Sequence, residues 1–292
     1  MMRFLRLLGR LPLALLHRLG AVLGWVVYVV SPSYARQLRE NLRSSGICGD
    51  ELRCRRLSRQ AVSEAGKALA EIVAVWFGPD EAVAGMVVAC DGWEAVERAQ
   101  TRGKGIIFLT PHLGCFEIAA LYGARRMPLT VLYRPPKQRW VEPVMTAGRS
   151  RLHAELAPTT VTGVRMLYKA LSRGAAVGIL PDQAPGEGEG VWADFFGRPA
   201  YTMTLVRRLQ EKCGAAVIMA FAERLDHGRG FHLHIHEVST ERFNETVLNR
   251  AVEEQVRRCP AQYLWGYNRY KIPAGAQPPP ALGGRGTQKA AG

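Results

Sequence analysis

Short apolar runs and helical patterns alternate along the middle of the chain. Six runs are rich in β-branched and other apolar residues and are bounded by Gly, Pro or polar residues, which is typical of buried strands. These runs are residues 86–89, 105–109, 129–133, 175–180, 216–222 and 231–238. Between most of them the pattern predicts helices, at residues 92–102, 115–125, 137–152, 163–173 and 203–213. The alternation predicts an α/β fold with a mainly parallel central sheet flanked by helices.

The N-terminal segment has a different pattern. Residues 1–30 are mostly apolar, with arginines at their start and Arg18 near the middle. No small-residue cleavage site follows, so we expect the segment to be retained as a membrane-anchoring helix. It is long enough to span a bilayer, although Arg18 would cost roughly 2.5–3.5 kcal/mol at the centre. A helix lying in the cytoplasmic leaflet fits equally well, and a buried core helix is the alternative.

Three more helices complete the predicted organisation. Residues 31–46 and 50–77 form basic helices before the first strand, and residues 245–258 form an amphipathic helix after the last one. We therefore expect an anchor at residues 1–30, one α/β domain at residues 31–272, and a low-complexity, disordered tail at residues 273–292.

Composition limits the classes of protein to which this chain can belong. The 292 residues are 48% apolar, which excludes wholesale disorder. The net charge of +14 predicts attraction to an anionic partner: nucleic acid, anionic lipid or an acidic carrier protein. Six scattered cysteines, with no Cys-x-x-Cys pair, indicate neither a structural zinc site nor a disulfide framework. A reducing, cytoplasm-facing location is the simplest interpretation.

The most informative polar residues follow the second predicted strand. His112 lies on the turn after residues 105–109, and Glu117 falls in the first turn of the next helix. A carboxylate there is favoured by the helix dipole and can hold the imidazole in one tautomer. This arrangement is typical of an oriented general base, although a helix-capping His112 beside a solvated Glu117 is the alternative.

Other candidate residues also follow strands. Arg134 comes after residues 129–133, and Asp182 comes after residues 175–180, so parallel strands would place both at the edge that carries His112. Three further histidines alternate along the strand at residues 231–238 and could form a metal site. No carboxylate pattern near them completes such a site, and a half-exposed strand explains the alternation.

Four sequence blocks together resemble the lipid A secondary (lauroyl/myristoyl) acyltransferases, within the glycerolipid acyltransferase superfamily. His-x4-Glu alone is weakly specific, but the blocks occur in order between residues 34 and 271. They are His112 to Glu117, Pro181-Asp182-Gln183, Phe195-Phe196-Gly197-Arg198-Pro199-Ala200, and Tyr263-Leu264-Trp265.

The resemblance implies an acyltransferase with an acyl-carrier protein as donor and a phosphorylated glycolipid, a lipid A precursor, as acceptor. His112 would be the general base and Glu117 its orienter. Oxyanion or substrate contacts would come from Gly114, Cys115, Arg134 and Asp182, and an aromatic wall for the acyl chain from Phe195 and Phe196. It implies the inner membrane, with the catalytic domain facing the cytoplasm, and no metal or other cofactor.

Several alternatives remain at this point. Cys115 could act as a nucleophile activated by His112, as in a thioester hydrolase. The acceptor could be another glycolipid or a lysophospholipid, or the chain could be a non-enzymatic, membrane-bound basic module. Of the possible anionic partners, nucleic acid is the one that the sequence favours least, because the arginines are spread over the whole chain without interleaved aromatic residues. Acyl-chain length and the acylated position do not follow from the sequence.

Overall fold

A seven-stranded sheet forms the centre of the protein. The computed structural model describes residues 2–136, 138, 140–151 and 154–279. The strand order is β1-β9-β8-β2-β5-β3-β4, and every neighbouring pair is parallel except β8 with β9. The bounds are β1 (Val87–Asp91), β2 (Ile106–Leu109), β3 (Leu129–Tyr133), β4 (Ala154–Pro158), β5 (Ala176–Ile179), β8 (Ala216–Arg224) and β9 (Phe231–Val238).

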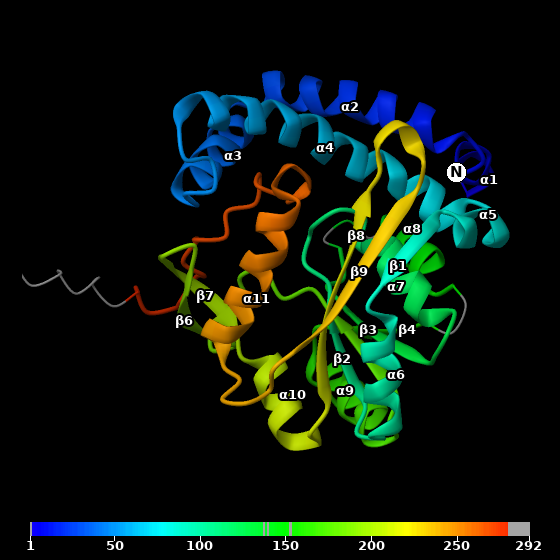
Figure 1. The fold of residues 1–292 in the computed structure, drawn as a ribbon, viewed down its shortest axis with the longest axis vertical. Helices are drawn as coiled ribbons and strands as arrows, with labels where there is room; N and C mark the ends of the chain where they lie inside the picture. The colour runs from blue at the N-terminus through cyan, green and yellow to red at the C-terminus, as the bar shows by residue number, and fades with distance from the viewer. Residues whose placement is uncertain (1, 137, 139, 152–153, 280–292) are drawn as a thin grey trace, which may run out of the picture.

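Helices cover both faces of this sheet (Figure 1). Side chains alternate along β2, so that Ile107 and Leu109 join one apolar core and Ile106 and Phe108 join the other. The first core is covered mainly by α9 (Val161–Ser172), α10 (Leu205–Cys213) and α11 (Glu245–Arg258). The second is covered mainly by α5 (Asp80–Gly85), α6 (Trp93–Thr101) and α7 (Phe116–Ala124). Helix α8 (Glu142–Arg149) lies between β3 and β4 along the chain. The α/β fold with a mainly parallel sheet is therefore confirmed.

The N-terminal helices lie across one end of the sheet (Figure 1). They are α1 (Met2–Leu8), α2 (Leu13–Val30), α3 (Pro32–Ser44) and α4 (Glu51–Phe77). Helix α2 packs along α4 with the two backbones very close together. A β-carbon on Gly66 would lie 1.9 Å from the carbonyl oxygen of Gly20, and one on Gly24 would lie 2.3 Å from that of Val62. The two helices can approach this closely only because glycines face each other at the contact.

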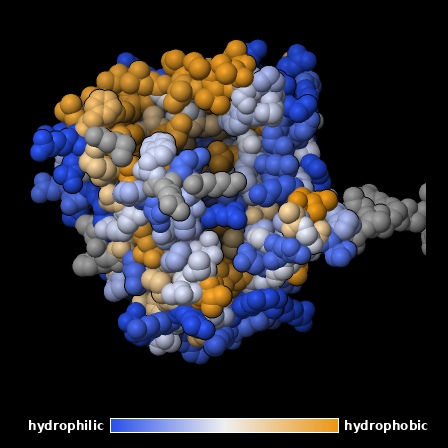
Figure 2. Space-filling view, turned by 180° about the vertical axis from the view of Figure 1, so that it is seen from behind, coloured by the Kyte–Doolittle hydropathy of each residue, from blue (hydrophilic) through white to orange (hydrophobic). Residues whose placement is uncertain are grey.

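The outer face of α2 is apolar and exposed. Leu13–Val30 is long and apolar enough to cross a membrane, and only 22% of it is buried. The space-filling view shows an apolar band along the end of the molecule where α2 lies (Figure 2). The exposed apolar side chains of this helix include Leu15, Leu19, Val22, Leu23, Val26, Val29 and Val30. Such a surface indicates a contact with lipid or with another apolar partner.

The structure adds elements that the sequence pattern did not predict. Strand β4 lies where the pattern gave no strand, and β6 (Gly190–Phe195) pairs with β7 (Arg198–Met203) in a separate antiparallel hairpin. A disulfide joins Cys48, just before α4, to Cys54 in the first turn of that helix, a bridge that the scattered spacing of the cysteines did not predict. Of the predicted disordered tail, residues 280–292 lie outside the described residues, as do parts of the predicted helix 137–152.

Candidate active site

The turn after β2 carries His112 and is fixed mainly by later parts of the chain. The backbone N–H of Leu264 donates to the carbonyl oxygen of His112 at 3.0 Å. Gly114 donates to the carbonyl of Gln262 at 3.2 Å, and Cys115 donates to that of Ala222 at 2.8 Å. Gly114 has φ +60°, and a β-carbon there would lie 2.0 Å from the Ala222 oxygen. Only glycine fits this position, because both its left-handed backbone and its close approach exclude a side chain.

Asp182 binds the imidazole of His112. Strands β2 and β5 are neighbours, so Asp182, just beyond β5, reaches across to the turn after β2. Its Oδ1 lies 2.8 Å from His112 Nδ1, and its Oδ2 accepts from the His112 backbone N–H at 2.9 Å. The carboxylate thereby fixes Nδ1 as the protonated nitrogen and leaves a lone pair on Nε2. Gln183 Nε2 lies 3.1 Å from that nitrogen.

The surroundings keep Asp182 ionised. Burial alone would raise its pKa, but the charge interaction and hydrogen bonds with His112 outweigh burial, and the pKa is lowered. Burial, together with the neighbouring Asp182 carboxylate, holds the pKa of Tyr263 well above its usual range. A neutral phenol beside a charged carboxylate can donate a hydrogen bond to it, which further favours the ionised form.

Glu117 has other partners. Its carboxylate accepts from Arg149 Nε at 3.1 Å and from Trp76 Nε1 at 3.0 Å. The expectation that Glu117 holds the His112 ring is therefore wrong for the geometry seen here. The physical reason is strand order: the end of β5 lies directly beside the end of β2, whereas Glu117 sits in the first turn of α7 and faces α4 and α8.

Two of the expected oxyanion donors are already used. The backbone N–H groups of Gly114 and Cys115 both donate to carbonyl oxygens. The Cys115 side chain is buried, and burial raises the pKa of its thiol well above the usual range, with the nearby Glu71 carboxylate adding to the effect. A buried, protonated thiol is a poor nucleophile, which disfavours covalent catalysis by Cys115.

Among the described residues, the remaining predicted site residues make no hydrogen bond or ring contact with His112. Arg134 follows β3 at the expected edge of the sheet, and its side chain is exposed. Phe195 and Phe196 are buried in the core with Tyr263 and Trp265, at ring separations of 4.8–6.4 Å. The structure thus brings Asp182 and Gln183 to His112, and it places the aromatic pair in the packing behind the β6–β7 hairpin.

An apolar pocket opens beside the turn. It lies between α7 and the sheet and measures about 560 Å³, including the space at its open mouth. Phe116, whose ring is 4.9 Å from that of His112, lines it together with Glu117 and Arg149. Small residues line it further along α7 and β5, namely Ala119, Ala120, Gly123 and Gly178. A pocket lined by apolar and small side chains suits an apolar chain whose polar end stays near His112.

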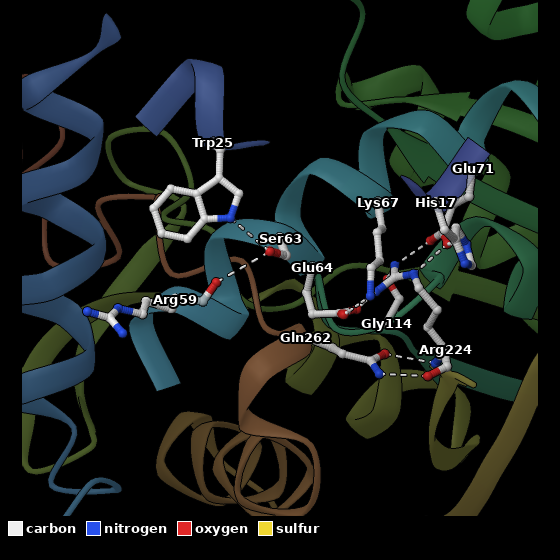
Figure 3. A network of polar contacts seen from close by, with 10 residues as sticks. All are labelled: His17, Trp25, Arg59, Ser63, Glu64, Lys67, Glu71, Gly114, Arg224 and Gln262. Atoms are coloured by element: carbon white, nitrogen blue, oxygen red, sulfur yellow. Dashed lines mark hydrogen bonds and ion pairs between the residues drawn. The ribbon is translucent and has the colours of Figure 1, made fainter. Parts of the chain in front are cut away.

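A buried ionic network supports the same turn from behind (Figure 3). Arg224, at the end of β8, donates to both Glu71 oxygens in α4 and to the carbonyl oxygen of Gly114 at 3.3 Å. His17 of α2 binds the same Glu71 carboxylate at 3.1 Å. Burial alone would raise the pKa of Glu71, but Arg224 and then His17 outweigh it and lower the pKa to about 2. This network connects the N-terminal helix to the His112 turn.

Some of these residues gave no signal in the sequence. Trp76, Arg149 and Arg224 lie in different helices and strands, far from His112 along the chain, and each occupies an ordinary position in its own element. Gln183 could have been found, because it directly follows Asp182 at a predicted strand end.

Comparison with known proteins shows the family of this chain. A family model described as bacterial lipid A biosynthesis acyltransferase matches residues 1–272. The chain is 28% identical over 212 residues to a lipid A biosynthesis palmitoleoyltransferase of Escherichia coli (strain K12), covering 70% of this chain and 68% of that protein. It is 24% identical over 272 residues to a lipid A biosynthesis lauroyltransferase of the same organism, covering 91% and 88%. The chain therefore belongs to the bacterial lipid A biosynthesis acyltransferase family and is an acyltransferase.

Proposed function

We propose that this protein transfers a fatty acyl group from an acyl-carrier-protein thioester to a hydroxyl group of a lipid A precursor, with His112 as the general base. The observation that carries the proposal is the imidazole held through Nδ1 by Asp182, which leaves the lone pair of the ring on Nε2. Gln183 contacts Nε2 at 3.1 Å, so its amide would give way to the acceptor hydroxyl.

The reaction follows from these groups. The acceptor oxygen attacks the thioester carbonyl while its proton passes to His112 Nε2. The tetrahedral oxyanion collapses, the carbon–sulfur bond breaks, and the leaving thiolate takes the proton back from the imidazolium. Asp182 stabilises the imidazolium during both steps because its carboxylate is ionised and directly bonded to Nδ1.

The oxyanion needs donors other than the two N–H groups already paired. The first-turn N–H groups of Phe116 and Glu117 in α7 are the nearest candidates, because N–H groups in a helix's first turn have no partner within the helix. Arg134 is exposed at the same edge of the sheet and stays a candidate for contact with an anionic substrate. Glu117 stays a candidate for catalysis, acting through Arg149, which lines the pocket with it.

We propose that the apolar pocket takes the acyl chain. Its lining residues lie along α7, directly after the His112 turn, so a thioester carbonyl at His112 would leave the chain pointing into the pocket. The donor and the acceptor are both anionic, which suits the net charge of +14.

We further propose that α2 lies within one leaflet of the inner membrane, with the catalytic domain in the cytoplasm. Helix α2 packs along α4, which carries charged residues throughout. Spanning the bilayer would take those charges into the hydrocarbon core, whereas lying flat exposes only the apolar face of α2 to lipid. The exposed arginines of α1 to α4 would then contact lipid phosphates; they include Arg10, Arg18, Arg36, Arg39, Arg53 and Arg59.

The activity is tested with purified protein, an acyl-carrier-protein thioester and a lipid A precursor. His112→Ala should lower the rate by about 10²–10⁴ because a positioned base contributes that much. Cys115→Ala and His227→Ala, the latter at an exposed surface position, should keep the rate near that of the unmodified protein. An acyl adduct on Cys115, together with an inactive Cys115→Ala, would instead establish covalent catalysis.

Membrane attachment is tested separately by flotation with anionic vesicles. Replacing Val22 and Val26 with Asp should abolish flotation, since both side chains are more than half exposed on α2. Val161→Asp is the matched control, because Val161 is 70% exposed on α9 at another part of the surface. Equal flotation of all three proteins would show that α2 is not the attachment surface.

A further inference from the structure

Two histidines and a carboxylate converge at the edge of the central sheet, away from the pocket. His232 and His234 point to the same face of β9, and the parallel neighbour β1 places Asp91 opposite His234. His232 Nε2 lies 2.8 Å from Asp91 Oδ2, and His234 Nδ1 lies 3.9 Å from the same oxygen. All three atoms lie within 4.8 Å of one another.

The two ring nitrogens do not have hydrogen-bond partners among the described residues. His232 Nε2 and His234 Nδ1 are both buried, and neither has a partner with suitable geometry. The contact between His232 Nε2 and Asp91 is short, but it lacks the direction that a donated N–H requires. Buried polar atoms without partners are costly, and potential ligand atoms that lie within 4.8 Å of one another can share one bound ion.

Glu223 fixes the tautomer that metal binding needs. Its Oε2 lies 2.9 Å from His234 Nε2, on the opposite side of the ring from Nδ1. A proton shared with Glu223 at Nε2 leaves the lone pair on Nδ1, which faces Asp91 and His232. Histidines that bind metals almost always donate their other ring N–H to a carboxylate or carbonyl in this way.

We propose that Asp91, His232 and His234 bind a divalent transition-metal ion of the zinc class. Two imidazole nitrogens with one carboxylate oxygen suit zinc or cobalt and not magnesium or calcium, which prefer oxygen ligands. Metal–ligand distances of roughly 2.0–2.1 Å require donor atoms about 3.3–3.5 Å apart in a tetrahedral site. Asp91 is 70% exposed, so its side chain can make this small adjustment and a water molecule can fill the fourth position.

The site would stabilise an edge of the sheet and would not take part in acyl transfer. Strand β1 is an edge strand paired with β9, and the proposed ion would connect Asp91 of β1 with two side chains of β9. Asp91 is far from the two histidines along the chain, which is why the alternating histidines alone did not predict a site. The expected consequence of binding is a higher unfolding temperature.

The test uses full-length protein without a histidine tag, stripped with a chelator and titrated with Co²⁺. We expect one equivalent to bind with the visible absorption of a tetrahedral cobalt site, and Zn²⁺ to displace it and raise the unfolding temperature. Asp91→Asn and His232→Ala should each weaken Co²⁺ binding at least tenfold. Asp91 is exposed, so its variant tests the ligand without disturbing the core.

His236→Ala is the matched control. His236 lies on the same face of β9, but it contacts Gln255 of α11 at 3.4 Å and is not part of the cluster. It should bind Co²⁺ like the unmodified protein. The proposal is overturned if unmodified protein binds no Co²⁺ in the tetrahedral form, or if His236→Ala weakens binding as much as His232→Ala does.

Discussion

Replacing Asp182 with Asn tests which carboxylate orients His112. The substitution keeps the size of the side chain and removes the charge that binds both Nδ1 and the backbone N–H of His112, at 2.8 and 2.9 Å. A hydrogen bond to a charged group contributes about 1.5–3 kcal/mol. If both bonds act on the transition state, the barrier rises by roughly 3–6 kcal/mol, which is a loss of about 10²–10⁴ in rate.

The assay measures kcat and KM separately with the acyl-carrier-protein thioester and the lipid acceptor. Loss of an interaction that matters in the transition state lowers kcat and leaves KM nearly unchanged. Thermal unfolding of Asp182→Asn shows whether the fold is retained. The double variant with His112→Ala should be little slower than His112→Ala alone, because the two residues act as one unit.

Glu117→Gln tests the alternative, in which Glu117 and not Asp182 orients His112. It weakens the pair with Arg149 in the lining of the pocket, so it should alter KM or stability more than Asp182→Asn does. If Glu117→Gln loses most of kcat while Asp182→Asn keeps it, the imidazole is oriented by Glu117 during the reaction, and the reasoning from the observed contacts is refuted.

Three further predictions concern stability and chain selection. Gly66→Leu should lower the free energy of unfolding by at least about 1–3 kcal/mol, measured by denaturant titration, because its side chain would collide with Gly20, whereas Gly85→Ala, with open space around it, should not. The pKa of Glu71 falls from 4.5 to about 2 on folding, so its contribution of about 3 kcal/mol is complete above pH 4.5 and is lost as the pH falls towards 2. In urea titrations Glu71→Gln should therefore be less stable at pH 7 and vary less between pH 5 and 3; an unchanged pH profile would contradict this. Gly123→Leu should fill part of the pocket and shift the transferred chains towards shorter ones, measured by mass spectrometry of the product, and an unchanged product would exclude the pocket as the acyl site.

The sequence predicted the positions of the strands better than their contacts. All six apolar runs became strands of the central sheet, because β-branched runs bounded by Gly or Pro give a strong local signal. Strand β4 was missed, since Ala154–Pro158 has no β-branched residue and ends in proline. The prediction that His112 and Asp182 lie at the same edge of the sheet was also confirmed, because both follow strands and their side chains meet there.

The partner of His112 could not be predicted in the same way. Asp182 is 70 positions away along the chain, and it meets His112 only because β5 lies next to β2. Strand order is decided by packing between distant segments, whereas Glu117 was near in sequence and therefore the obvious candidate. The contact between α2 and α4 was missed for a similar reason. The role of Gly20 and Gly66, which is to allow close approach of the two backbones, can be recognised only when the helices are known to lie side by side.

The way the His112 turn is held has a consequence for synthesis on the ribosome. Helix α2 leaves the ribosome long before Ala222, Gln262 and Leu264, which hold the turn. A nascent chain can therefore present its apolar helix long before it has a formed turn around His112. Chains that stop before Gln262 should be inactive even though β2, His112 and Asp182 are all present, because the turn would lack the contacts to Gln262 and Leu264.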